Sequence, residues 1–326
     1  MKILIYGSGV IGTSYAWLLS EAGFDISLLV RKIRYVRYSH SGVMVNCTDL
    51  RAKGEGFDQT VFRPKTVDKL EPSAAYDLII VAVRHTQLND VIPHLSKFSG
   101  NAHLLFMGHS YEALPLISKH LPKGRYLFGF PEIIGGGQTD NGISVVIFDK
   151  GHTWLGEPDG KTSARLKEVM RIFKEAGLSP AVHRNILGFL QLHSVWPVVL
   201  AGAATKASGM RQLSGNTRLI KQLRGAAREG MQLRKTRGVS VLMDHPWCMV
   251  SLPGFLSVWM IRRWARRREV QEAWEGFFRH CGDEITKQFR DIRKEGQEKS
   301  KPMPYWLSLE KHLETRFGVA PAERKA

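Results

Sequence analysis

The first third of the chain alternates short apolar runs with segments in which apolar residues recur every three or four positions. Strands are predicted by KILIYG (2–7), DISLLV (25–30), YDLIIVAV (76–83) and AHLLFMG (102–108), and helices by GTSYAWLLSEAG (12–23) and TQLNDVIPHLSKF (86–98). Because consecutive parallel strands need a crossover connection, usually a helix, this order is typical of a parallel sheet with helices on both faces. We therefore predict a doubly wound α/β domain.

The pattern changes after Gly124. RYLFGF (125–130), GISVVIF (142–148) and HTWLGEP (152–158) are short strand-like runs between Gly, Asp and Asn turns, which favours antiparallel strands that close the first domain. The segment 163–177 has helical spacing, and from about Arg184 onward the long segments also predict helices. We place the domain boundary near His183, with an α/β domain at 1–183 and an all-helical domain at 184–326.

Composition agrees with two folded domains. Of the 326 residues, 43% are hydrophobic and 10% aromatic, a composition that argues against a disordered protein. The length of the chain exceeds what one hydrophobic core usually supports. Cys47, Cys248 and Cys281 lie far apart without a CxxC pair, so neither a disulfide framework nor a zinc site is expected. MKILIYGSG runs directly into a strand and predicts no signal peptide, and we expect a cytoplasmic protein.

The formal net charge of +17 indicates an anionic partner, which can be nucleic acid, a membrane surface or a small molecule. No helix-turn-helix pattern or aromatic-basic interleaving supports nucleic acid. The basic amphipathic stretch 249–268, MVSLPGFLSVWMIRRWARRR, is compatible with an interfacial helix on anionic lipid. A basic outer face on an ordinary helix is the interpretation we prefer, which leaves a membrane role open without predicting one.

Gly7, Gly9 and Gly12 form G-x-G-x-x-G between the first strand and the first helix. In this position the first glycine permits a tight turn, the second lets backbone approach a pyrophosphate, and the third lets helix and strand pack closely. Val10 and Ile11 then belong to the helix N-terminus, whose unpaired N–H groups favour phosphate. We predict a dinucleotide-binding, Rossmann-type domain; a glycine turn without ligand is the alternative.

The end of the second strand carries Arg31 and Lys32, followed by Arg34 and Arg37. Enzymes that use NAD usually place an acidic residue here to hold the ribose 2′-OH. A pair of cations suits a 2′-phosphate instead, because guanidinium and ammonium groups form charge-assisted hydrogen bonds with phosphate oxygens. We predict NADP(H) as cofactor; solvated surface cations are the alternative.

Six stretches resemble the ketopantoate reductase (2-dehydropantoate 2-reductase) family and cover most of the chain. They are GSGVIGTSYAWLLSEAGFDISLLVR, YDLIIVAVRHTQLNDVI, MGHSYEAL, GISVVIFDKGHTWLGEP, RLKEVMRIFKEAGLSPAVHRNI and WPVVLAGAATKASG. The resemblance implies a Rossmann domain followed by a helical domain, with the substrate between them. It also implies hydride transfer from NADPH to the ketone of a branched 2-oxo acid.

The cofactor residues of the family map onto this chain better than its catalytic residues do. Gly7, Gly9, Gly12 and Arg31 fall on family cofactor positions, and Arg84 replaces a lysine that follows the fourth strand. The family's Asn-Gly after the fifth strand is Met-Gly-His-Ser here, which makes His109 and Ser110 candidate substrate contacts. The family's catalytic lysine and two asparagines map onto three residues that cannot replace them: Gly188, Leu192 and Trp196.

Four other residues are candidates for the missing chemistry. His193 lies in the helix that carries the family's lysine and is our candidate proton donor, although a core histidine is the alternative. His280, Asp283 and Glu284 have the i, i+3, i+4 spacing of one helical face near the family's glutamate. We predict catalytic roles for His280 and Glu284 and a substrate contact for Asp283; a solvated face is the alternative. With no third ligand at a recognisable spacing, no metal is predicted.

The prediction is therefore an NADPH-dependent reductase of a small anionic carbonyl compound, similar to ketopantoate reductase. The alternative is a protein that binds NADP(H) without turnover, as a sensor or scaffold. A homodimer is left open as its assembly.

Overall fold

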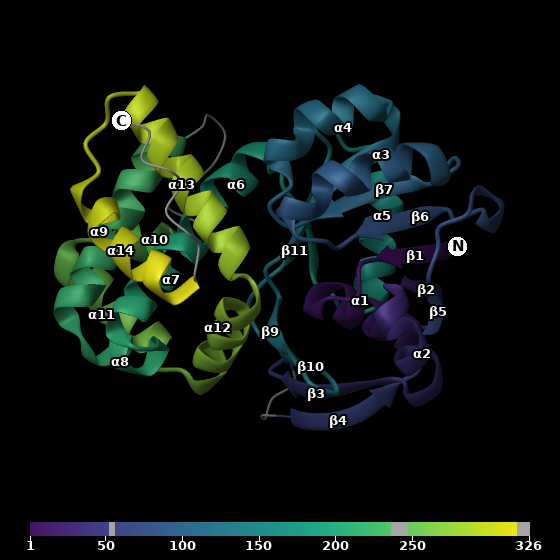
Figure 1. The fold of residues 1–326 in the computed structure, drawn as a ribbon, viewed down its shortest axis with the longest axis horizontal. Coiled ribbons are helices and arrows are strands. Elements are labelled where there is room, and N and C mark those ends of the chain that lie inside the picture. The colour runs from purple at the N-terminus through teal and green to yellow at the C-terminus, as the bar shows by residue number, and fades with distance from the viewer. Residues whose placement is uncertain (52–55, 236–246, 318–326) are drawn as a thin grey trace. The chain divides into compact units, whose positions relative to one another are not determined.

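A computed structural model describes residues 1–51, 56–235 and 247–317 (Figure 1). The chain divides into two compact units, Met1–Leu190 and Gln191–Ala326. The first is an α/β unit and the second is built from helices, so the predicted fold class is confirmed.

The main sheet of the first unit has eight strands in the order β12-β11-β8-β7-β6-β1-β2-β5. Their bounds are β1 (Lys2–Tyr6), β2 (Asp25–Leu29), β5 (Lys65–Val67), β6 (Leu78–Val81), β7 (His103–Met107), β8 (Tyr126–Pro131), β11 (Thr153–Gly156) and β12 (Pro180–Val182). Neighbouring strands are parallel except β8 and β11, which are antiparallel. The antiparallel closure predicted for the HTWLGEP strand is therefore confirmed.

Helices cover both faces of this sheet. Strand residues alternate between the faces, so that Ile3 and Ile5 pack in one core cluster and Leu4 in the other. The first cluster includes α1 (Val10–Glu21) and α5 (Ala164–Glu175), whose Tyr15 and Phe173 rings lie 5.4 Å apart. The second includes α3 (Leu88–Phe98) and α4 (Leu114–His120), which lie side by side in Figure 1. Apolar strands buried on both faces explain the uninterrupted hydrophobic runs in the sequence.

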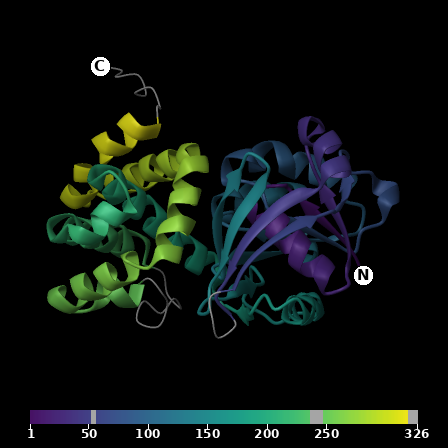
Figure 2. The same ribbon diagram turned by 90° about the horizontal axis from the view of Figure 1, so that it is seen from below.

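A second, smaller sheet has the order β4-β3-β10-β9. It consists of β3 (Val43–Asp49), β4 (Gly56–Phe62), β9 (Ile134–Thr139) and β10 (Gly142–Ile147). Strand β10 is antiparallel to β9, as expected, but it is parallel to β3 and belongs to this sheet rather than to the main one. The sheet packs beside α1, as Figure 2 shows, and α2 (Lys32–Ser41) precedes β3.

Short 3₁₀ helices among the described residues connect these elements, at Pro72–Ala74, His85–Gln87, Tyr111–Ala113 and Lys123–Arg125. The sequence predicted a boundary near His183. The first unit extends beyond it, to Leu190. Helix α6 (Ile186–His193) causes the difference, because its buried Ile186, Phe189 and Leu190 pack in the core of the first unit.

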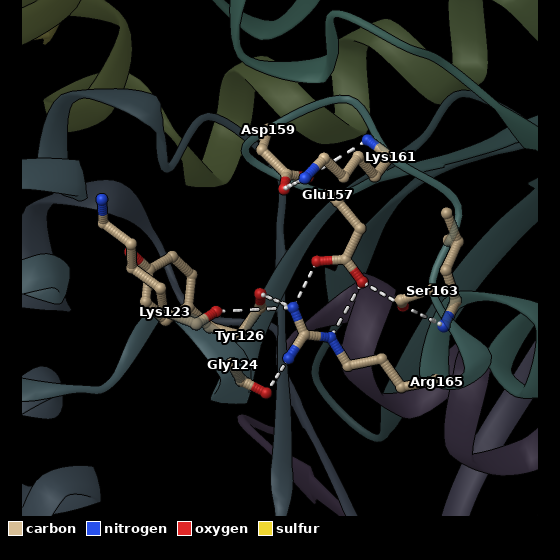
Figure 3. Close-up of polar contacts among 9 residues, drawn as sticks. Lys123, Gly124, Tyr126, Glu157, Asp159, Lys161, Ser163 and Arg165 are labelled. Atoms are coloured by element: carbon tan, nitrogen blue, oxygen red, sulfur yellow. Dashed lines mark hydrogen bonds and ion pairs between the residues drawn. The ribbon is translucent and has the colours of Figure 1, made fainter.

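A buried ion pair fixes the start of α5 (Figure 3). Arg165 Nε donates to Glu157 Oε1 at 2.8 Å, and its guanidinium also donates to the backbone carbonyls of Gly124 and Tyr126. Ser163 caps α5 through its hydroxyl, which also donates to Glu157. Because Glu157 is buried and Arg165 is largely buried, these surrounding hydrogen bonds are needed to offset the desolvation of the two charges. The pair joins the end of β11 to α5 and to the start of β8.

The second unit is helical throughout the part that the structure describes. After α6 it contains α7 (Val195–Ala207), α8 (Met210–Gly215), α9 (Thr217–Arg234), α10 (Trp247–Ser251), α11 (Gly254–Ala265), α12 (Arg268–His280), α13 (Gly282–Glu298) and α14 (Pro304–Phe317). Helix α7 is buried from Val195 to Ala204 and packs against α9, α13 and α14. Among the described residues, Ile186–Ala207 is long and apolar enough to cross a membrane, but 89% of its most apolar window is buried, which is typical of a core helix.

Candidate cofactor site

The three glycines after β1 face different surroundings. Gly7 has φ +120°, and a Cβ there would lie 2.5 Å from the Ala82 carbonyl oxygen. A Cβ on Gly12 would lie 1.9 Å from the Gly7 carbonyl oxygen, so both positions require glycine. A Cβ on Gly9 would meet no protein atom within 4 Å. Gly7 and Gly12 are therefore explained by packing, whereas the space at Gly9 is open to a ligand.

Gly9 is also the N-cap of α1, without a side-chain hydrogen bond. The first turn of the helix contains Val10 and Ile11, whose partly buried side chains pack against the core. The first intrahelical hydrogen bond is donated by Thr13 to the Gly9 carbonyl. The backbone N–H groups of the first turn therefore have no intrahelical acceptors and carry the positive end of the helix dipole. This arrangement fits a phosphate group.

The glycine turn lies where the strand order reverses. The chain passes from β1 to β2 and β5 on one side, then returns to β6 on the other side of β1. Ala82 follows β6 and donates its N–H to the Tyr6 carbonyl at 2.9 Å, so the carboxyl ends of β1 and β6 adjoin. Arg84 comes two residues later at the same edge, where its N–H donates to Gln87 Oε1 at 3.2 Å. Open α/β sheets bind their ligands at such a switch point.

The predicted 2′-phosphate cations follow β2. Arg31 is the N-cap of α2, and both Arg31 and Lys32 are exposed. Arg34, one turn further, reaches back to the glycine loop: its Nη1 donates to the Ser8 carbonyl at 3.2 Å. Its Nη2 donates to Gln138 Oε1 at 3.0 Å, and Gln138 Nε2 donates to the same Ser8 carbonyl at 3.3 Å. A cation is thus held against the loop by contacts within the protein.

Arg34 and Gln138 also line a small hollow of about 70 Å³ together with Arg37 and Asp140. The sequence indicated Arg34 only as one of several cations near a strand end. Gln138 was not predicted, since it lies in the glycine-rich run of β9 more than a hundred residues later. Its contact with Ser8 depends on how the small sheet packs beside α1, which no local pattern reveals.

His109 and Ser110 follow β7 at the same edge of the sheet as Arg84. Gly108 has φ +90° and donates its N–H to the Gly129 carbonyl at 2.9 Å, which ties the turn to β8. The His109 ring lies 5.1 Å from the Phe130 ring. Ser110 is 2% exposed, and its N–H donates to the Gly108 carbonyl at 2.8 Å. The turn is well ordered by these contacts, and its predicted role toward substrate stays a prediction.

The histidine and carboxylate candidates lie in the second unit. His193, the last residue of α6, is 6% exposed, and Glu284 is 8% exposed. The prediction that His280, Asp283 and Glu284 share one helical face is wrong: α12 ends at His280, and α13 begins at Gly282. The side chains of His280 and Asp283 are exposed, in contrast to that of Glu284.

The break between α12 and α13 lies at Cys281. Cys281 ends α12 with φ −115° and ψ 23°, outside the helical region. A Cβ on Gly282 would lie 2.4 Å from the Phe317 ring, so the glycine lets α14 pack against the corner. Residues distant in the sequence, Gly282 and Phe317, thus lie close together at this corner.

The three positions onto which the resemblance maps the family's lysine and asparagines carry no titratable side chain. Gly188 lies in α6, where its N–H donates to Asn185 Oδ1 at 3.0 Å. Leu192 and Trp196 are each 1% exposed and belong to the apolar core. A site on this helix therefore depends on other residues, and His193 is the titratable neighbour of Leu192.

Within the described residues, no three His, Cys, Asp or Glu side chains lie close enough together to hold a metal ion. No disulfide joins the three cysteines. Burial raises the pKa of the Cys47 thiol to about 12, and the neighbouring Asp49 adds to the shift. Cys47 is therefore a protonated core residue at neutral pH and a poor nucleophile.

Residues 3–160 match the family model "Ketopantoate reductase PanE/ApbA". Two curated 2-dehydropantoate 2-reductases are similar to this chain, that of Aquifex aeolicus with 25% identity over 193 residues and that of Pyrococcus horikoshii with 27% over 195. Each match spans 58% of this chain and 58% of the relative's own length. Through these residues the chain is similar to the ketopantoate reductase family.

Solved structures of the ketopantoate reductase fold resemble the whole chain. A 2-dehydropantoate 2-reductase from Geobacter metallireducens has a TM-score of 0.71 at 19% identity, covering 97% of this chain and 99% of its own. A D-mandelate dehydrogenase solved with NADH and anilino(oxo)acetate has a TM-score of 0.72 at 16% identity, covering 98% of both chains. At these identities the likeness establishes the fold: a Rossmann-like domain followed by a helical domain.

Proposed function

We propose that the protein is an NADPH-dependent reductase of a small, anionic 2-oxo acid-like carbonyl compound. One observation carries the proposal: the open space at Gly9 faces the first turn of α1 at the switch point of the sheet. The match of residues 3–160 to the ketopantoate reductase family model supports the reaction class. The D-mandelate dehydrogenase solved with NADH and an oxo acid supports the same class of cofactor and substrate.

The residues around the glycine turn fit a dinucleotide. The N–H groups of Val10 and Ile11 would hold the pyrophosphate, for which Gly9 leaves room. Arg84, at the adjoining end of β6, would add a cation. When bound, the nicotinamide supplies the hydride that reduces the carbonyl carbon. The role of the protein itself is to bind and orient the cofactor and the substrate and to deliver a proton.

The choice of NADPH over NADH rests on the residues after β2. Arg31 and Lys32 are exposed, and neither has an acidic neighbour in the sequence. A guanidinium at this point can form two parallel hydrogen bonds with a phosphate. Arg34 is already positioned through Ser8 and Gln138, so little of its side-chain entropy remains to be lost when a phosphate binds. Together the three cations favour a 2′-phosphate over a neutral 2′-hydroxyl.

Proton delivery is assigned to His193. A reduced carbonyl oxygen needs a donor that titrates near neutral pH, and imidazole does so. The positions of the family's lysine and asparagines hold Gly188, Leu192 and Trp196, none of which titrates. His193, which directly follows Leu192 in the sequence, is the titratable residue nearest to them that we assign to this role. His280 and Glu284 are assigned to supporting roles and Asp283 to substrate contact, as are His109 and Ser110 in the first unit.

The alternative is a protein that binds NADP(H) without turnover. This alternative is favoured by Gly188, Leu192 and Trp196, because none of these residues can replace the family's catalytic lysine and asparagines. The experiment that separates the two has two stages. NADPH and NADH binding are first measured by cofactor fluorescence, and NADPH oxidation is then followed with a panel of 2-oxo acids, ketones and imines that includes ketopantoate.

Tight NADPH binding with oxidation of at least one panel member supports the reductase. Tight binding with no turnover on the whole panel supports the sensor or scaffold. Absence of NADPH binding would refute both, since both depend on the glycine turn.

A further inference from the structure

Helix α11 exposes three large apolar side chains in the second unit. The side chains of Phe255, Leu256 and Trp259 are 76%, 39% and 60% exposed. The opposite side of the helix is buried through Ser257, Ile261 and Ala265 and packs against α8 and α9. The exposed residues are therefore not required for the helix to pack on its own unit. An isolated exposed apolar residue is ordinary, but three on two successive turns form a patch that indicates an interaction surface.

Cations continue the same face of α11. Arg263 follows Trp259 by four residues and Arg266 by seven, so all three lie on one side of the helix. Both arginines are exposed, and neither pairs with a carboxylate of the described residues. The apolar patch thus runs directly into a basic patch.

A hollow of about 500 Å³ opens beside α11, between it and α9. Lys221, Arg224 and Arg228 of α9 line it, and Gly254 and Val258 of α11 form another part of its wall. Arg224 Nη2 donates to the Leu252 carbonyl at 2.7 Å, which anchors this guanidinium to the segment before α11. Burial and the neighbouring Arg228 both lower the pKa of Arg224, which indicates concentrated positive charge.

The hollow also contains one carboxylate, Glu229. Its oxygens accept the N–H groups of Tyr305 and Trp306 at 3.1 and 2.8 Å, at the first turn of α14. The carboxylate therefore caps a helix and pairs with none of the three cations within the described residues. The hollow keeps an excess of positive charge and fits an anionic group such as a phosphate.

We propose that this face of the second unit docks on a membrane of anionic phospholipid. Phe255 and Trp259 would enter the interfacial region, where aromatic side chains are favoured, and Arg263 and Arg266 would lie against the headgroups. The hollow of Lys221, Arg224 and Arg228 would hold one headgroup phosphate. Apolar residues and unpaired cations together match a lipid surface, which presents acyl chains and phosphates side by side.

A second copy of the chain fits this face less well. A symmetric dimer uses the same patch twice, so the five cations of one copy would meet the five of the other, and the one carboxylate in the hollow, Glu229, is already engaged with the first turn of α14. An anionic membrane neutralises all of them. The proposal is independent of the reductase activity, because every residue involved lies outside the candidate cofactor and catalytic residues.

The test is co-sedimentation of the full-length protein with vesicles. We expect binding to phosphatidylcholine vesicles that contain phosphatidylglycerol, little binding to pure phosphatidylcholine, and weaker binding as salt rises. Vesicles with brominated acyl chains should quench tryptophan fluorescence, and Trp259→Phe should remove most of that quenching. No binding to the anionic vesicles would overturn the proposal.

Matched double variants then locate the surface. Arg263→Glu/Arg266→Glu and Lys221→Glu/Arg228→Glu should each lower vesicle binding about tenfold or more, because each reverses two charges next to the lipid. Phe255→Ser/Trp259→Ser should lower it comparably while leaving the net charge unchanged. The control Arg279→Glu/Lys311→Glu makes the same change of charge at exposed positions of the same unit and should have a much smaller effect.

Equal losses of vesicle binding in the control and the surface variants would show that net charge alone explains the binding, and would contradict the proposal. So would a dimer in sedimentation velocity that Phe255→Ser/Trp259→Ser dissociates, since the face would then cover a second copy. Melting curves of each variant identify any loss of vesicle binding that is due to unfolding. The single substitution Trp259→Ser, at an exposed position, replaces Phe255→Ser/Trp259→Ser if that double variant fails to fold, and the single substitutions Arg263→Glu and Lys221→Glu replace the charge-reversal variants in the same way.

Discussion

Arg34 donates a hydrogen bond to the backbone carbonyl of Ser8, so the first helix after β2 is joined to the glycine turn after β1. Gln138 accepts from the same guanidinium and donates to the same carbonyl, which adds the small sheet to the contact. Three segments far apart in the sequence thus fix the shape of the loop. A loop fixed in this way loses less entropy when it binds a dinucleotide.

The first prediction concerns cofactor choice. Arg31→Asp should weaken NADPH binding by about 2 to 4 kcal/mol, because a charge-assisted hydrogen bond is lost and a repulsion is added. NADH binding should change much less. Fluorescence titration with both cofactors measures the difference, and equal affinity of the unmodified protein for NADH and NADPH would show that these cations do not select the phosphate.

The second prediction isolates Arg34. Arg34→Ala should weaken binding of NADPH about tenfold, because both a cation and the anchor of the loop are removed. Arg37→Ala is the matched control: Arg37 lies on the same helix, but its Nη2 donates to Asn141 Oδ1 and not to the loop. Isothermal titration of both variants decides the matter. If the two lose the same affinity, charge alone accounts for the effect.

The third prediction separates the roles of two glycines. Gly9→Ala should fold normally, since its Cβ meets no protein atom within 4 Å, yet it should bind NADPH poorly. Gly12→Ala should instead destabilise the protein by about 1 to 3 kcal/mol, because its Cβ would overlap the Gly7 carbonyl. Thermal melting and cofactor titration are compared for both. A Gly9→Ala variant with unchanged affinity would mean that the turn has only a structural purpose.

The fourth prediction tests the proton donor. His193→Ala should lower the turnover rate about 10²- to 10⁴-fold with little change in NADPH affinity, because general acid catalysis stabilises the transition state. His280→Ala should raise the apparent Michaelis constant more than it lowers turnover. Steady-state kinetics on the substrate found in the panel provide the measurement. Unchanged turnover of His193→Ala would exclude it as donor, and a lowered melting temperature would indicate damage to the fold.

The fifth prediction concerns pH and stability. Burial lowers the pKa of His103 below its usual 6.5, and the nearby Arg165 and Arg125 charges lower it further. Below about pH 6.5 the unfolded chain therefore binds a proton that the folded state resists, so stability falls as pH falls. Burial acts on His94 in the same direction. Urea unfolding between pH 7 and pH 5 should show a smaller loss in His103→Gln than in the unmodified protein.

His40→Gln is the control for that experiment, because it removes an exposed histidine from the same unit. Its loss of stability between pH 7 and pH 5 should match that of the unmodified protein. An identical pH slope in His103→Gln would show that His103 does not contribute.

The main sheet could be predicted because its strands are apolar runs buried on both faces, as Leu78–Val81 shows. The small sheet could not, since most of β4 is exposed and β9 is rich in glycine. The glycine turn and the cations after β2 were found from a local motif. The Ser8–Arg34 contact depends on tertiary packing and leaves no such signal.

The ends of helices in the second unit also could not be predicted from local sequence patterns alone. The i, i+4 spacing of His280 and Glu284 was interpreted as one face because a single Gly282 does not necessarily end a helix. The break lies at Cys281, and the contact of Gly282 with Phe317 joins residues distant in the sequence. The stretch 249–268 was expected to be a basic outer face, whereas the structure adds the exposure of Phe255 and Trp259.

The parallel pair of β3 and β10 has a consequence for synthesis of the chain. Met44 pairs with Gly142, about a hundred residues later, so β3 has no partner on that side until β10 has left the ribosome. An unpaired strand edge is a template for association with other chains, and such distant pairings form slowly. A truncated protein that ends before Gly142 should therefore aggregate, although it contains the whole glycine turn and the cations that follow β2.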